Sequence, residues 1–344
     1  MITARESTAR ESIDVFTALL DERTDLQEQL ARHAQQILPG PAGLLAETRS
    51  YALSNSGKLL RPLLLLEACR AAGGDPDIVF PAAAGTESGH VASLIHDDII
   101  DGDRERRGRE TLHVKYDLAA AILTGDLLIF ETFLSYTYCH DRGASAETVL
   151  SAIRTLSSTC IDVCRGQALE AAIAGDFETT EQTYFDMIGL KTASVCRAAT
   201  RIGALLSDAD DSVVEALSAY GDNLGVAFQI VDDVLSYAGR PAVVGKPLKS
   251  DLRNHRVTLP LIYALQQGGP SVRARIRALF AETDGAAAHD ELTRILTSTH
   301  ALERARACAN EHTATAKARL DLLPYSESRE RLRSLADIFL ARDY

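Results

Sequence analysis

Aspartates gather at two places in otherwise apolar, helix-like text. LIHDDIIDGDRERRG contains Asp97, Asp98 and Asp101, and FQIVDDVLSYAG, much further along the chain, contains Asp232 and Asp233. On a helix, Asp97 and Asp101 share one face and Asp98 lies at its edge. Carboxylates this close repel one another, and the cost grows with burial, so we expect a cation to lie between them.

The carboxylate clusters favour magnesium as that cation. Mg²⁺ prefers hard oxygen ligands, and it typically takes one or two carboxylates and fills its other positions with water and substrate phosphate. If helices bring the two clusters to the rim of one cavity, they would hold several Mg²⁺ ions around a diphosphate. For a single cluster, a solvated helix end is an equally good interpretation, but two clusters make that alternative weaker.

Isolated basic residues beside apolar text strengthen the diphosphate hypothesis. Arginine binds phosphate oxygens bidentately, and lysine binds them as a point charge. Each cation alone is typical of a solvated surface, whereas together with the aspartates they indicate a site for two diphosphates, one held through metal and one held directly. The cations are Lys58, Arg61, Arg106, Arg107, Lys191 and Lys246.

Nearly the whole chain has the pattern of helix. Apolar residues recur at spacings of three and four, and no convincing strand alternation is present. Glycine and proline mark the joins at LPGPAG, AAGGDPD and YAGRPAVVGKP. The expected helices cover 13–37, 43–55, 58–72, 80–101, 117–139, 145–173, 180–205, 210–237 and 257–267.

Length and composition indicate a soluble globular protein with a sizeable core. The chain has 344 residues, of which 46% are hydrophobic and 24% charged. We predict an all-α fold, one large helical bundle forming a single domain over 1–344, with its motif-bearing core at about 40–267 and peripheral helices at 268–344.

Charge and hydropathy narrow the possible partners and location. The net charge of -12 argues against a nucleic-acid partner. The first residues lack the apolar core of a signal peptide, and no stretch approaches the ~18 uninterrupted apolar residues of a membrane span. We therefore expect a cytoplasmic location without a membrane span.

In their order and spacing, the motifs resemble those of the trans-isoprenyl diphosphate synthases, the polyprenyl synthetase family. GKLLRP is similar to the GKxxRP element, HDDIIDGDRERRG to the first aspartate-rich motif, and FQIVDDVLS with the following loop to the second. TGDLL, RGQALE and LKTAS fall where the family has its GD, G-E/Q and KT elements. The resemblance covers about 40–267 and implies a bundle of the isoprenoid synthase type with a central substrate cavity, and a homodimer.

The resemblance also implies a reaction. An allylic diphosphate would condense with isopentenyl diphosphate by Mg²⁺-assisted ionisation, alkylation and proton loss, with release of diphosphate. The site would hold roughly three Mg²⁺ ions when diphosphate is bound. The implied catalytic residues are Asp97, Asp98, Asp101, Lys191, Asp232 and Asp233, of which Asp97, Asp101 and Asp232 would ligate the metal.

The same resemblance divides the remaining residues between two substrate pockets. The allylic diphosphate would be bound by Arg106, Lys191 and Lys246, with Thr192 and Gln229 nearby. Isopentenyl diphosphate would be bound by Lys58, Arg61, His90 and Arg107. His96, beside Asp97, is a metal ligand or an orienting hydrogen-bond partner.

Three positions depart from the family pattern. Leu59 stands where an extra basic residue is common. Ser236 stands where the second motif usually has a third aspartate, and a hydroxyl is a weaker Mg²⁺ ligand. Arg256, another expected substrate-binding residue, replaces a usual lysine and keeps the charge with a different geometry.

Small residues before the first aspartate motif indicate a long product. In the family, bulky aromatics four and five residues before the first aspartate stop growth at fifteen carbons, and one helical turn of ~5.4 Å spans about one isoprene unit. We therefore expect geranylgeranyl diphosphate or a longer product. The alternative is that small residues merely permit close helix packing. The chain-length positions are Ser88, Gly89, Ala92 and Ser93, with Phe133 as a possible floor.

Two other functions compete with this prediction. A class I terpene cyclase usually has an Asn/Ser/Glu metal triad in place of the second aspartate motif and needs no isopentenyl site. Lys58, Arg61 and Arg107 argue against a cyclase, whereas DDVLS leans toward one. A non-catalytic partner subunit of a hetero-oligomeric synthase tends to lose its aspartates, and this chain keeps five of the six. A plain helical scaffold would explain none of the ordered motifs.

Overall fold

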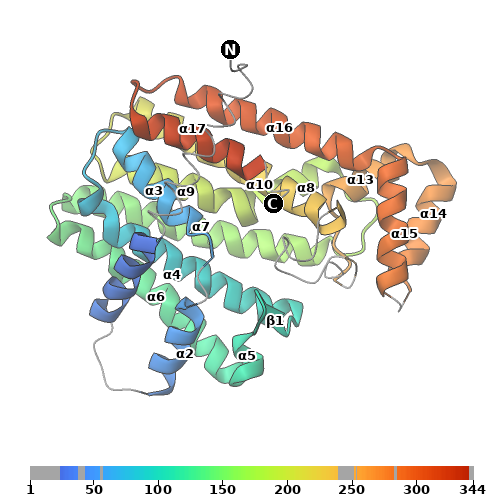
Figure 1. The fold of residues 1–344 in the computed structure, drawn as a ribbon, viewed down its shortest axis with the longest axis horizontal. Helices are drawn as coiled ribbons and strands as arrows, with labels where there is room; N and C mark the ends of the chain where they lie inside the picture. The colour runs from blue at the N-terminus through green and yellow to red at the C-terminus, as the bar shows by residue number, and fades with distance from the viewer. Residues whose placement is uncertain are drawn as a thin grey trace, which may run out of the picture. The chain divides into compact units, whose positions relative to one another are not determined.

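The computed structural model describes residues 24–37, 43–54, 57–238, 252, 254–282 and 285–340, and it is almost entirely helical (Figure 1). The all-α prediction is confirmed, and where the helices are described their bounds lie within a few residues of those expected. Residues 24–37 form a first helix. It is followed by α2 (Leu44–Leu53), α3 (Leu60–Ala71), α4 (Pro76–Asp101), α5 (Leu112–Lys115), α6 (Leu118–Asp141), α7 (Ala146–Ala172), α8 (Glu181–Ile188), a π-helical turn η1 (Gly189–Ala193), α9 (Ser194–Leu205), α10 (Asp211–Ala238), α13 (Leu259–Gln267), α14 (Gly269–Phe280), α15 (Gly285–Ser298), α16 (Ala301–Leu320) and α17 (Glu327–Leu340).

The chain divides into two compact units, which are described separately below. Unit 1 takes the described parts of Met1–Thr155 with Ala199–Leu217 and Leu320–Ile338. Unit 2 takes the described parts of Leu156–Ala198, Ser218–Arg319 and Phe339–Tyr344. The expectation of a single domain stays a prediction.

In unit 1, α4 packs along α6, while α3 packs on α4, and α2 and α5 pack on α6 (Figure 1). Small residues make the α4–α6 contact close. A Cβ added to Gly85 would lie 2.8 Å from the Cβ of Ser135, and one added to Gly89 would lie 3.1 Å from Oγ1 of Thr132. Ala92, one turn further along α4, is fully buried. Gly85, Gly89 and Ala92 therefore form the packing face of α4.

The sequence sets both ends of α4. Asp75 is the N-cap, and its side chain accepts a hydrogen bond from the backbone N–H of Asp77, while Pro76 occupies the first helical position. Gly102 adopts the left-handed conformation at φ 64° and ends the helix directly after Asp101. The first aspartate cluster therefore lies at the C-terminal end of α4.

A short β-hairpin after α4 is an element that the sequence analysis missed. Strands β1 (Glu105–Arg106) and β2 (Arg109–Glu110) pair antiparallel. The residues between them, Arg107 and Gly108, have φ of 53° and 73°, and a type I′ turn requires positive φ at both positions. Strands of two residues are too short to show an alternating pattern, which explains the omission.

Unit 2 has its own buried core, and the C-terminal helices contribute to it. Ile230 and Val234 of α10 and Leu261 of α13 belong to one buried cluster. Helices α14, α15 and α16 add to the same cluster with Leu279, Leu292, Leu296, Ala305 and Ala309, each with no exposed surface.

Candidate active site

Both aspartate clusters lie near the C-terminal ends of helices. Helix α4 ends at Asp101, and α10, which carries Asp232 and Asp233, ends at Ala238. The dipole of a helix is negative at this end, so it adds to the repulsion among the carboxylates. Each cluster therefore requires nearby donors or cations.

In unit 1, Arg106 compensates the charge of Asp98. Asp98 is buried, and Arg106 approaches its Oδ1 with both Nε and Nη2 at 2.6 Å. The hairpin turns the chain back so that Arg106 reaches the end of α4. Asp97 and Asp101 remain half-buried. The opposed charges in HDDIIDGDRERRG thus include one local ion pair.

In unit 2, Asp233 is held by two neutral donors. Asp233 is buried, and its Oδ2 accepts from the hydroxyl of Tyr184 at 2.7 Å and its Oδ1 from the amide of Gln229 at 2.8 Å. Gln229 in turn accepts from Oγ1 of Thr192 at 2.8 Å. Asp232 is half-buried. In both clusters, therefore, the second aspartate of the pair is buried and held by a neighbour.

Tyr184 is a site residue that the sequence analysis missed. It has no exposed surface, and burial, reinforced by the adjacent Asp233, raises its pKa well above the ordinary value. The hydroxyl is therefore protonated at neutral pH and can donate to Asp233. A tyrosine on the apolar face of a helix looks like an ordinary core residue, so the sequence carried no signal for this role.

The π-helical turn η1 carries Lys191 and Thr192. Such turns often occur at functional sites. Two glycines let neighbouring helices approach it: a Cβ added to Gly166 of α7 would lie 2.5 Å from the backbone nitrogen of Lys191, and one added to Gly225 of α10 would lie 2.5 Å from the Cα of Ala193. Close backbone packing therefore fixes the position of η1 in unit 2.

Glu170 of α7 connects two of the expected diphosphate-binding cations. Its Oε2 lies 2.6 Å from Nζ of Lys191, and its Oε1 lies 3.7 Å from Nε of Arg256. Unit 2 thus brings Lys191, Thr192, Gln229 and Arg256 into one connected set. Glu170 belongs to the RGQALE motif, but the sequence gave it no role.

In unit 1, the expected isopentenyl-binding residues also meet. Nη1 of Arg61 lies 3.1 Å from Nε2 of His90. The guanidinium of Arg107 packs so closely on Gly57, the residue before Lys58, that a side chain at Gly57 would overlap it. Among the described residues, Nε of Arg61 is buried and has no hydrogen-bond partner. A buried donor of this kind is costly unless it is satisfied, and an anion placed there would satisfy it.

Burial controls the charge of His90 and of a neighbouring acid. Burial lowers the pKa of His90 well below its ordinary value, and the charges of Arg61 and Arg107 lower it further. A neutral His90 accepts a hydrogen bond from Arg61. Glu87, one turn earlier on α4, is buried, and burial raises its pKa against the opposing influence of Arg61 and Arg107. Glu87 is a second residue that the sequence analysis missed.

Comparisons with known proteins decide the family. The sequence model of the polyprenyl synthetase family matches residues 42–297. The chain belongs to the polyprenyl synthetase family.

Individual relatives agree with this assignment. The chain is 35% identical to a geranylgeranyl diphosphate synthase from Methanosarcina mazei, over 96% of this chain and 100% of that one. It is 34% identical to a geranylfarnesyl diphosphate synthase from Natronomonas pharaonis, over 96% and 98%. It is similar in structure to a polyprenyl synthase from Caulobacter crescentus CB15 complexed with calcium and isoprenyl diphosphate, with a TM-score of 0.86, 30% identity and 95% and 97% coverage. The prediction of an isoprenyl diphosphate synthase is confirmed.

In this polyprenyl synthetase, His96 and Ser236 each contact a neighbouring protein group. The His96 ring packs directly on Gly125, and its Nε2 lies 3.7 Å from Oδ1 of Asp126. This contact favours an orienting role for His96 over metal ligation. Oγ of Ser236 lies 3.2 Å from the carbonyl of Asp232, so the serine in place of the third aspartate bonds back to its own helix. Lys246 lies outside the described residues.

The chain-length positions separate into two groups. Gly89 and Ala92 belong to the α4 face packed on α6, which is the alternative that the sequence left open for them. Ser88 and Ser93 are half-buried, and Oγ of Ser93 donates to the carbonyl of His90 at 2.8 Å. Phe133 is half-buried on α6.

The carboxylates present suit a Mg²⁺ ion whose coordination is completed by substrate phosphate. Within the described ranges, no three His, Cys, Asp or Glu side chains are placed to hold a metal ion by themselves. Mg²⁺ usually needs only one or two carboxylates when phosphate oxygens complete its coordination, and the half-buried Asp97, Asp101 and Asp232 supply such carboxylates. Because the clusters belong to different units, their expected meeting stays a prediction.

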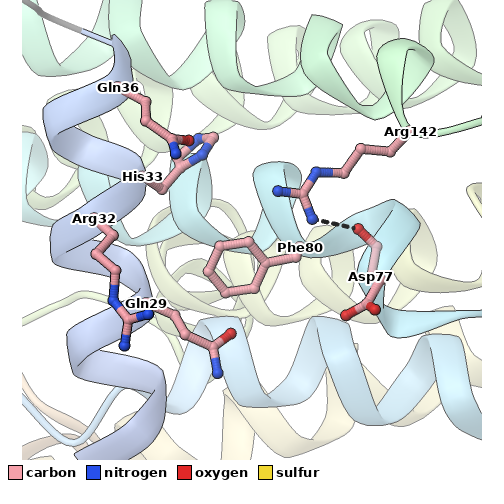
Figure 2. A pocket seen from close by; sticks show the side chains of 7 residues that line it. All are labelled: Gln29, Arg32, His33, Gln36, Asp77, Phe80 and Arg142. Atoms are coloured by element: carbon pink, nitrogen blue, oxygen red, sulfur yellow. Dashed lines mark hydrogen bonds between the residues drawn. The ribbon is translucent and has the colours of Figure 1, made fainter.

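A small pocket of about 160 Å³ lies elsewhere in unit 1 (Figure 2). Asp77 and Phe80 line it from the first turns of α4, some 20 residues or roughly 30 Å from the aspartate cluster at the other end of that helix. Arg142 donates to the backbone carbonyl of Asp77 at 3.0 Å (Figure 2). The pocket is therefore separate from the residues that carry the chemistry.

We predict that His90→Gln reduces the acid sensitivity of the fold. In the unfolded chain, histidine has a pKa of about 6.5, whereas in the folded chain His90 stays neutral well below that pH. The unfolded state therefore takes up the extra proton, and the free energy of unfolding falls as the pH drops below 6.5, by up to about 1.4 kcal/mol per pH unit. Denaturant titrations between pH 8 and 5 should show a shallower loss for the variant. Parallel profiles would contradict the burial of a neutral His90.

Proposed function

We propose that this polyprenyl synthetase condenses an allylic diphosphate with isopentenyl diphosphate and releases inorganic diphosphate. The observation that carries the proposal is the group that Arg61 of the GKLLRP segment forms with His90, with Arg107 packed on Gly57 of the same segment, all in unit 1. A terpene cyclase has no use for a second cation site, and a non-catalytic subunit need not keep one.

The allylic diphosphate is the substrate of the aspartate clusters. Asp97, Asp101 and Asp232 would bind Mg²⁺ ions, roughly three per site, which when bound neutralise the leaving diphosphate. Lys191 and Arg256 would contact its oxygens, with Thr192 nearby. Charge that develops on the leaving group is stabilised at these cations, so the allylic C–O bond ionises.

Isopentenyl diphosphate is held by cations without metal. Lys58, Arg61 and Arg107 bind its diphosphate, and neutral His90 keeps Arg61 in place. The double bond of the isopentenyl group attacks the allylic cation and forms the new C–C bond. A proton leaves the resulting cation for the departing diphosphate, and no side-chain nucleophile takes part.

Asp98 and Asp233 support the metal ligands beside them. Both are buried and bound by protein donors, so they orient the ends of α4 and α10 in which Asp97, Asp101 and Asp232 lie. The donors differ between the units. Asp98 is bound by the guanidinium of Arg106, and Asp233 is bound by the hydroxyl of Tyr184 and the amide of Gln229.

We also propose geranylgeranyl diphosphate or a longer product, made in the cytoplasm. Ser93 leaves room one turn before Asp97, and the Methanosarcina mazei and Natronomonas pharaonis relatives are named for C20 and C25 diphosphates.

A homodimer through α6 completes the proposal. Among the described helices, α6 alone is long and apolar enough to cross a membrane by length and composition, yet only 44% of that stretch is buried within the chain. The exposed face carries Leu118, Ile122, Leu123, Phe130 and Leu134. Asp126 lies in the middle of this helix and its side chain is 51% exposed. A carboxylate at the centre of a bilayer costs about 2.5–3.5 kcal/mol, so a second copy of the chain covers this face better than lipid does.

The central test is turnover with labelled isopentenyl diphosphate, Mg²⁺ and dimethylallyl, geranyl or farnesyl diphosphate as primer. We expect label in linear products. Asp97→Ala should lower turnover at saturation by at least ~100-fold, because it removes a group that stabilises the leaving diphosphate. Lys58→Ala should mainly raise the KM for isopentenyl diphosphate, by about 10–100-fold for the loss of one charged contact.

Lys115→Ala, an exposed lysine of the same unit, is the matched control. Equal effects of Asp97→Ala and Lys58→Ala on both substrates would refute the two pockets. Unlabelled cyclic hydrocarbon would indicate a cyclase, and no turnover with any primer would indicate a non-catalytic subunit.

Ser93→Phe should shorten the product by about one isoprene unit, because the ring fills one helical turn of the channel beside α4. Chromatography of the dephosphorylated products measures the length. Ser54→Phe, at an exposed serine outside α4, is the control and should leave the product length unchanged. If Ser93→Phe leaves the length unchanged, product length is set elsewhere.

Phe130→Glu should convert the dimer to a monomer, because it places a charge in an apolar contact. Analytical ultracentrifugation gives the mass of each species. Leu322→Glu changes an exposed leucine outside α6 and should leave the dimer intact. A wild-type monomer at micromolar concentration would contradict the dimer.

A further inference from the structure

Glu170 is an acidic residue among the cations that are expected to bind the allylic diphosphate. One of its carboxylate oxygens faces Lys191 at 2.6 Å and the other faces Arg256 at 3.7 Å. The reaction as proposed above gives this carboxylate no part. An anion at this place occupies the same two cations that a diphosphate would need.

The three charges interact strongly because little water surrounds them. The side chains of Glu170, Lys191 and Arg256 are 18%, 18% and 17% exposed. At such sites the effective dielectric constant is far below that of water, and salt screens the interaction less than at the surface. Glu170 therefore changes how tightly the two cations hold any other anion.

Backbone packing fixes the distance between Glu170 and Lys191. Gly166, one turn before Glu170 on α7, permits the backbone of η1 to lie against α7. On the other side of η1, Thr192 is tied to Gln229 of α10 by a hydrogen bond of 2.8 Å. The lysine stem is intrinsically flexible, so the carboxylate of Glu170 is the group that aligns its ammonium.

We propose that Glu170 is a positioning residue and an internal counter-ion for the diphosphate site. It aligns Lys191 and Arg256 while the site is empty, and it weakens their hold on inorganic diphosphate so that this product leaves after each condensation. Product release limits kcat in many enzymes, so a weaker hold on inorganic diphosphate favours turnover. The inference rests on the proposed function.

Glu170→Gln tests the role of the charge with nearly the same shape. We expect inorganic diphosphate with Mg²⁺ to bind roughly tenfold more tightly, because the substitution removes a negative charge from a partly buried position beside two cations. We also expect kcat to fall. Calorimetric titration measures the affinity directly, and inhibition against the allylic substrate measures it during turnover. A merely structural role would weaken diphosphate binding and lower kcat together.

Glu170→Asp separates position from charge. The shorter side chain keeps the charge but cannot align the lysine at the same distance, so kcat should fall while the affinity for diphosphate stays within about threefold of wild type. Glu147→Gln, which removes one exposed carboxylate from the same helix, should change neither quantity. In a Lys191→Gln background, Glu170→Gln should change the affinity much less than it does alone.

Unchanged or weaker diphosphate binding in a folded Glu170→Gln protein would overturn the inference. So would a Glu170→Gln substitution that changes the diphosphate affinity equally with and without Lys191→Gln. If Glu170→Gln does not fold, diphosphate binding by Glu170→Asp that is more than about threefold weaker than wild type would overturn it equally. Wild-type protein that consumes no isopentenyl diphosphate would instead refute the proposed function, and the calorimetric result on Glu170 would still be readable.

Discussion

The structure depends on placing carboxylates at the negative ends of two helices, where electrostatics oppose them. Asp97, Asp98 and Asp101 lie in the last turns of α4, and Asp232 and Asp233 lie near the end of α10. Repulsion among the carboxylates and the helix dipole both disfavour this arrangement. The donors to Asp98 and Asp233 offset part of this cost, and the proposed binding of divalent cations with a diphosphate would offset more.

In each unit, protein donors bind the buried aspartate of the pair, but the donor groups differ. Arg106 neutralises buried Asp98, whereas buried Asp233 receives hydrogen bonds from Tyr184 and Gln229. Burial of a carboxylate is tolerated only when donors satisfy it. The half-buried aspartates that we propose as metal ligands lie directly beside these held carboxylates.

Glycines determine how close the supporting elements come. Gly85 and Gly89 bring α4 against α6, while Gly166 and Gly225 allow α7 and α10 to approach the turn that carries Lys191. In each case a methyl group would meet a neighbour at 2.5–3.1 Å. The small residues of α4 that suggested an open channel for a long product thus serve helix packing in part, while Ser88 and Ser93 are half-buried.

The sequence by itself determined the all-α class, the approximate helix bounds and the membership in the polyprenyl synthetase family, because a period of 3.6 and an ordered set of local motifs are properties of the chain. Only the tertiary structure decided that Asp98 and Asp233 are buried, that Tyr184 binds Asp233 and that Glu170 lies between Lys191 and Arg256. These contacts join residues far apart in the chain, so their existence depends on how helices pack. The hairpin at Arg107 and Gly108 also escaped the sequence analysis, because two-residue strands show no periodicity.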